Sequence, residues 1–206
     1  TLVDSGGATF NGNVQAVNVD LQDTTGAVTF ANGTTNTFTG ALTTSGGLSL
    51  SLLGDTTVTV DSTLANTGGV TFGNEVGDAL TFTGGLDTTA AVDAGDTTGT
   101  TLFGVLTSGG TQIDLGPVTL AGASTIDTAG GVLNVLDADG VGVDGIATAG
   151  NALTLNGGAT GVLTVSTLSG GGALTLTDSG STTFNGAVTA GATDLQLTTG
   201  TVSFAG

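Results

Sequence analysis

Apolar and polar residues alternate along short stretches throughout the chain. Residues 48–52, 58–60 and 174–176 each read apolar, polar, apolar. A period of two is typical of a β-strand with one buried face. No window of about 12 residues carries a helical stripe that is free of interior glycine or of β-branched runs. The pattern predicts an all-β chain made of short strands of about three to five residues.

Glycine follows each phenylalanine at a short distance. Each of the eight phenylalanines has a glycine within the next three residues. Glycine adopts the positive φ angles that tight corners need. The interval from Phe10 to Phe30 is the same as the interval from Phe184 to Phe204. We therefore expect each phenylalanine to end a strand just before a corner, in a coil of about 20 residues.

Two local features refine this expectation. In residues 173–190 we expect strands at 173–177 and 182–185, separated by a turn at Asp178-Ser179-Gly180. The single proline, Pro117, cannot donate a ladder hydrogen bond. We therefore expect it at a corner or at the start of a strand.

A longer repeat is superimposed on the coils. Residues 1–32 align without a gap onto residues 175–206. The identical pairs include Asp4 and Asp178, Phe10 and Phe184, Leu21 and Leu195, and Phe30 and Phe204. We predict one continuous β-solenoid over residues 1–206, with 1–174 as one large tandem repeat and 175–206 as the start of the next copy. At about 20 residues per coil, one repeat should hold eight or nine coils and be about 40 Å long.

The fold class predicted is therefore a single elongated parallel β-helix (β-solenoid). In such a stack each coil covers the edge of the coil before it. Residues 1–3 and 202–204 look like interior strands, and open strand edges favour edge-to-edge addition. We expect the coils to continue either through further covalent repeats or through copies of the chain stacked end to end.

The charge composition excludes several classes of partner. The chain has no Lys, Arg or His and 17 acidic residues, giving a formal net charge of −17. Without cationic side chains to meet phosphate, nucleic acid is excluded as a partner, and anionic membranes are unfavourable for the same reason. Its apolar runs are too short for a membrane span, so we expect no membrane insertion. Since trypsin-like proteases find no cleavage site, the composition suits a protein that persists outside cells.

Carboxylates and hydroxyls are the only groups left for catalysis, because His, Cys, Lys, Arg and Tyr are absent. Three interpretations of the acidic clusters are open: a carbohydrate-cleaving aspartate pair, a calcium loop, or solvated turn residues. We expect no enzymatic activity and no required cofactor. The candidate calcium ligands are Asp137, Asp139 and Asp144, and a looser cluster comprises Asp87, Asp93 and Asp96.

Threonine strings such as residues 56–59 raise the alternative of a flat hydroxyl array, as in ice-binding solenoids. That function needs the same threonine positions on one face in successive coils. The strings do not keep a constant spacing along the sequence, so we do not expect such an array.

Residues 183–191 (TFNGAVTAG) and 152–158 (ALTLNGG) resemble the repeats of filamentous-haemagglutinin-type adhesins and autotransporter passenger domains. The resemblance rests on repeat style and covers essentially the whole chain. It implies a right-handed parallel β-helix, bacterial origin, secretion to the cell surface or beyond, and a role in adhesion or matrix.

The expected function is that of a structural segment of a long extracellular fibre or surface filament, serving attachment, cohesion or sheath formation. The expected partners are copies of the same chain, together with cell-surface or polysaccharide ligands. Two alternatives stay open at this point. One is an adhesin stalk that presents a receptor-binding tip, and the other is a carbohydrate-active β-helix enzyme.

Overall fold

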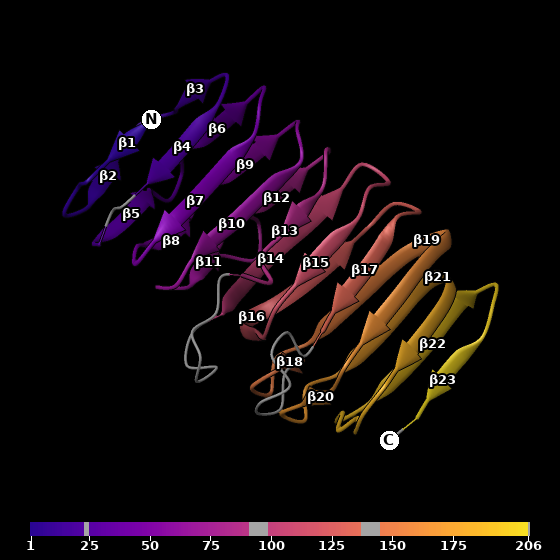
Figure 1. Ribbon diagram of the computed structural model, residues 1–206. Helices are drawn as coiled ribbons and strands as arrows, with labels where there is room; N and C mark the ends of the chain where they lie inside the picture. Colours follow the sequence, from indigo (N-terminus) through magenta and orange to yellow (C-terminus); the bar gives the residue numbers. More distant parts are fainter. Residues whose placement is uncertain (23–24, 91–98, 137–144, 206) are drawn as a thin grey trace.

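The computed structural model describes residues 1–22, 25–90, 99–136 and 145–205. It is an all-β parallel solenoid of about nine turns with about 21 residues per coil, and the described residues contain no helix. The strands lie side by side along one axis, with the two termini at opposite ends (Figure 1). This confirms the predicted fold class, while the right-handed sense implied by the resemblance stays a prediction.

Each coil has three faces, which the chain visits in the order A, B, C. Face A consists of β1 (Leu2–Val3), β4 (Val19–Gln22), β7 (Leu42–Gly46), β10 (Ser62–Asn66), β13 (Leu86–Asp87), β15 (Ile113–Leu115), β17 (Val132–Val135), the second parts of β19 (Leu153–Val165) and β21 (Leu174–Phe184), and β23 (Val202–Phe204).

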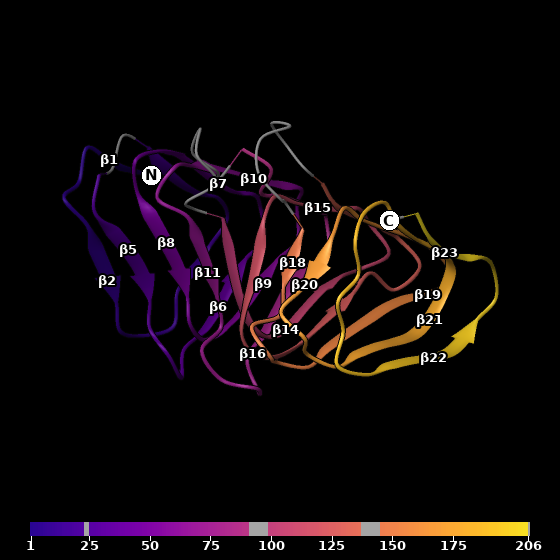
Figure 2. The same cartoon turned by 90° about the horizontal axis from the view of Figure 1, so that it is seen from below.

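Face B consists of β2 (Ala8–Phe10), β5 (Ala27–Phe30), β8 (Ser49–Leu52), β11 (Val70–Phe72), the first parts of β14 (Thr100–Ser108) and β16 (Val118–Asp127), β18 (Ile146–Ala147) and β20 (Leu168–Ser169). Face C consists of β3 (Gln15–Ala16), β6 (Thr35–Phe38), β9 (Asp55–Val58), β12 (Ala79–Phe82), the second parts of β14 and β16, the first parts of β19 and β21, and β22 (Thr193–Thr198). Figure 2 shows the same stack from below.

The interior holds the apolar side chains that alternate with outward polar ones. Five phenylalanines are fully buried along the axis: Phe30, Phe38, Phe72, Phe82 and Phe184. Rings in successive coils contact one another, as in the stacked pair Phe10 and Phe30 with centroids 4.8 Å apart. Each coil therefore completes the core of its neighbours, as expected for a solenoid.

Seven of the eight phenylalanines end their strands, as predicted. The prediction is wrong for Phe103, which lies inside β14 and points outward. Its ring lies against the backbone of Gly122 in the next coil, where an added Cβ would overlap it.

The expected turn at residues 178–180 is also wrong, because β21 runs through those residues as one strand and bends around the corner from face C to face A. The placement of Pro117 is confirmed, since it directly precedes β16 and accepts a hydrogen bond from the Thr100 amide.

Candidate functional site

The candidate calcium ligands lie outside the described residues. Asp137, Asp139 and Asp144 fall in residues 137–144, and Asp93 and Asp96 fall in residues 91–98. The calcium site therefore stays a prediction. Within the described ranges, no group of three or more acidic residues is arranged to hold a metal ion.

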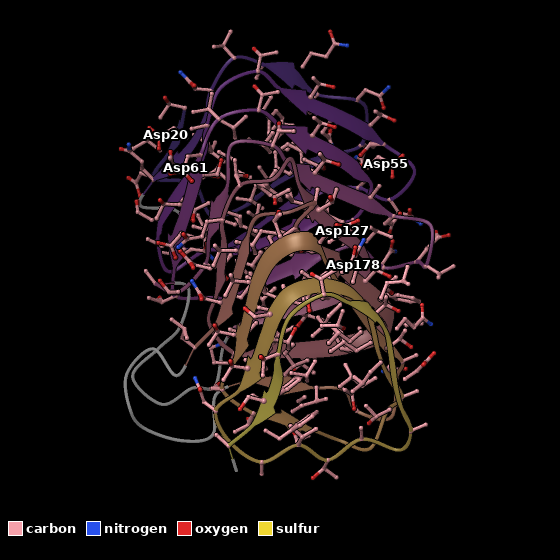
Figure 3. All side chains as sticks on the ribbon, turned by 90° about the vertical axis from the view of Figure 1, so that its right-hand side faces the viewer. Asp20, Asp55, Asp61, Asp127 and Asp178 are labelled. Carbon is pink, nitrogen blue, oxygen red and sulfur yellow. The ribbon has the colours of Figure 1, made fainter. Side chains whose placement is uncertain are left out.

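The described carboxylates are spread around the stack. In the end-on view, Asp20 and Asp61 lie on one side and Asp55 on the opposite side (Figure 3). Asp20 belongs to β4 on face A, and Asp55 belongs to β9 on face C. An acid and a base that act on one bond must face a common space, whereas Asp20 and Asp55 lie on different faces of the stack.

Two acidic residues stand directly next to each other on face A. Asp87 and Asp114 are register partners in β13 and β15, and both line a groove of about 320 Å³. Asp87 accepts hydrogen bonds from the Thr89 amide (2.8 Å) and hydroxyl (2.7 Å). Asp114 accepts from the side-chain amides of Gln112 (2.6 Å) and Asn134 (2.8 Å). These neutral donors hold both carboxylates without cancelling their charge.

Face B carries a continuous outward ladder of hydroxyl groups. In six successive coils the register aligns Thr9, Thr29, Ser51, Thr71, Thr101 and Thr119. The next two coils place Ala147 and Ser169 in the same column. The expectation that threonines do not align between coils is therefore wrong for this face.

The ladder was missed because the sequence spacing between its members varies. The step from Thr71 to Thr101 is much longer than the step from Thr101 to Thr119, so no fixed period reveals the members. A local signal does exist, since the tripeptides at residues 28–30 and 70–72 both read Val-Thr-Phe, and residues 118–120 read Val-Thr-Leu. The ladder borders a shallow groove of about 270 Å³ lined by Ser49, Thr71, Thr101, Thr119, Pro117 and several glycines.

The two end coils carry exposed apolar surface. At the C-terminal end, Leu195, Leu197 and Phe204 are 45%, 75% and 47% exposed. At the N-terminal end, Leu2 and Phe10 line an apolar hollow of about 360 Å³.

Together these features define a three-faced parallel β-solenoid with a hydroxyl ladder on face B and acidic residues on faces A and C. Across the described residues there is no helix long and apolar enough to cross a membrane. Comparison with protein families, curated proteins and solved structures finds no match to this chain. The solenoid fold is compatible with adhesin-type repeats, and no relative assigns the chain to that family.

Proposed function

We propose that this chain is a structural segment of a long extracellular fibre or surface filament built from tandem β-solenoid repeats. The observation that carries the proposal is that the last coils repeat the first. Leu2 pairs with Leu21, and their equivalents Leu176 and Leu195 pair in the same way. The Phe10–Phe30 rings stack at 4.8 Å and the Phe184–Phe204 rings at 5.1 Å.

Finer details repeat as well. In both places a glutamine donates to the aspartate two residues before it, over 2.6 Å (Gln22 to Asp20) and 2.8 Å (Gln196 to Asp194). A stack whose last coil has the geometry of its first can be extended without any change of architecture. Parallel ladders on three faces then supply length and rigidity, which are the properties needed for attachment, cohesion or a sheath.

Cryo-electron microscopy of the native material tests this proposal. Filaments should show an axial layer line near 4.8 Å, with density that continues from one repeat into the next. Compact separate particles without that spacing would overturn the proposal.

A second candidate, attachment through a polysaccharide, is favoured by the hydroxyl ladder and its groove on face B. Sugars are bound through hydrogen bonds to hydroxyl and backbone groups, and this groove exposes both. The double substitution Thr71→Val and Thr101→Val should abolish binding to a glycan array if the ladder is the site. The matched control is Thr57→Val with Thr81→Val, two partly exposed threonines on face C. Equal binding by both variants would remove this candidate.

A further inference from the structure

The C-terminal coil is the same structural unit as an interior coil, except that nothing covers it. Leu195 corresponds to Leu21 and Phe204 to Phe30, with the same strand pairing beneath. Leu21 and Phe30 are 2% and 1% exposed, whereas Leu195 and Phe204 are 45% and 47% exposed. The difference arises because β7 and β8 lie over β4 and β5.

The N-terminal coil also corresponds to an interior coil, in which the equivalent residues are covered. β1 and β2 correspond to parts of β21, where the equivalents of Leu2 and Phe10 are the fully buried Leu176 and Phe184. Those residues are covered by β19. The chain therefore contains, at interior positions, a cover that fits each of its two ends.

We propose that β22 and β23 are covered by a segment equivalent to residues 33–52 in a further copy of the repeat. This inference rests on the proposed tandem-repeat filament. The register follows from the interior pairs: Leu195 would face the equivalent of Thr44, as Leu21 does, and Phe204 would face the equivalent of Leu52, as Phe30 does. A second, separate molecule could offer only its first coil, because its own residues 33–52 are already in use.

This register has a geometric consequence, because the repeat does not contain a whole number of turns. Following face A from β1 through β4, β7, β10, β13, β15 and β17 to β19 takes seven turns. The chain then crosses face B in β20 and reaches Leu176, the equivalent of Leu2, on face C. One repeat therefore spans seven turns and two thirds, fewer than the eight or nine expected from 20-residue coils. The reason is that two coils are longer, those in which Thr71 pairs with Thr101 and Val132 pairs with Val162.

Each further copy is consequently rotated by about one third of a turn. At about 4.8 Å per turn, successive copies are about 37 Å apart, and the same side of the filament recurs after three copies and about 23 turns, or about 110 Å. The hydroxyl ladder of face B then appears on all three sides of the filament in succession. A partner that recognises one face would find it from any direction of approach.

The first experiment tests the cover. The chain has no Trp, so Phe204→Trp is a unique reporter. When the 206-residue chain is extended by residues 33–66, its emission should shift to the wavelength of Phe30→Trp in the unextended chain. Amide exchange of β23 should slow at least tenfold. The control extension has the same residues in reversed order and should leave both signals unchanged.

Two outcomes contradict the proposed cover. One is a reporter that stays solvent-exposed, or that responds equally to both extensions. The other is a concentration-dependent shift in the unextended chain, which would assign the end face to the first coil of a second molecule.

The second experiment tests the rotation. Four tandem repeats carry Thr71→Cys in each copy, which is selective because the chain has no Cys, and the thiols are labelled with a small gold cluster. Micrographs should show labels on one side about 110 Å apart. Labels about 37 Å apart on one side, in a filament that keeps the 4.8 Å layer line, would overturn the rotation and leave the proposed function intact. Absence of filaments would instead overturn the proposed function, while the reporter experiment still decides the cover.

Discussion

The first and second halves of the stack turn their corners in different ways. In the described part of residues 1–90 every strand has five residues or fewer and occupies one face, so the corners interrupt the ladder. In residues 99–205, β14 and β16 run without a break from face B to face C, and β19 and β21 run from face C to face A. These four strands have nine to thirteen residues.

The buried polar side chains differ accordingly. In the first half, the fully buried Asn66 donates to the carbonyls of Leu48 and Gly69 and accepts from the Thr44 hydroxyl. In the second half, Ser124 inside β16 donates to the carbonyls of Leu102 and Gly122. At the interrupted corner, Asn66 adds a second donor to each of two carbonyls that also accept from the Gly68 and Leu50 amides, and its oxygen accepts from a neighbouring hydroxyl. A continuous strand keeps its own ladder, so a single hydroxyl suffices.

The largest loss of stability is expected from Asn66→Ala. It removes one donor from each of the Leu48 and Gly69 carbonyls, which keep the Gly68 and Leu50 amides, at about 1 kcal/mol per lost bond. It also leaves the buried Thr44 hydroxyl without its acceptor, at about 1–3 kcal/mol. We expect the free energy of unfolding to fall by about 3–5 kcal/mol, measured by urea denaturation. The control is Asn185→Ala, at an exposed asparagine, with a change below about 0.5 kcal/mol. Similar losses in both variants would contradict this account of the corner.

The second prediction concerns the bend within β14. Gly104 has a φ of 110°, and an added Cβ would lie 2.5 Å from the Asp78 carbonyl oxygen. Gly104→Ala should therefore cost about 2–3 kcal/mol. Gly33 has a φ of 69° and open space around it, so Gly33→Ala should cost about 1 kcal/mol from backbone strain alone. Equal melting temperatures of the two variants would show that the bend tolerates a side chain.

A smaller effect is expected from Ser124→Ala. It removes one hydroxyl proton shared between two carbonyls while the ladder around it persists, and the expected loss is about 1 kcal/mol. Ser51→Ala, at a partly exposed serine on face B, should change stability by less than about 0.5 kcal/mol. Denaturation curves in which Ser124→Ala costs as much as Asn66→Ala would remove the distinction between the halves.

The smallest change in the free energy of unfolding is expected where the halves meet, at Asp87 in β13 and Asp114 in β15. Like charges directly opposite each other on adjacent strands repel. Asp87→Asn should raise the free energy of unfolding by about 0.5 kcal/mol at low salt, with a smaller gain at high salt. The control is Asp194→Asn. Because the register partner of Asp194 is the uncharged Thr175, the gain in the free energy of unfolding should be smaller there. A gain that is independent of salt would assign the effect to something other than charge.

Much of this fold could be predicted from the sequence because strands and corners are local. Alternation defines the strands, and the recurring phenylalanine-glycine spacing indicates the coil length. The same local signal misled at Phe103, where the following Gly104 bends a continuous strand, and at residues 178–180, where a turn-like sequence lies within β21.

The lateral surfaces could not be predicted, because they depend on which residues become neighbours between coils. The interval between register partners is short from Thr101 to Thr119 and much longer from Thr71 to Thr101. The hydroxyl ladder therefore has no fixed period along the chain. For the same reason the fraction of a turn left over in each repeat emerges only from the pairing.

The parallel ladders also have a mechanical consequence, since their hydrogen bonds run along the axis that a pulling force would load. A coil of about 21 residues occupies about 4.8 Å in the stack and about 70 Å once extended. Each coil peeled off under tension would therefore lengthen a tether by about 65 Å and dissipate work, while the remaining coils stay intact. A stack of this kind would be stiff at low load and would yield stepwise at high load, and single-molecule pulling would record a sawtooth whose longest steps come from the two longer coils.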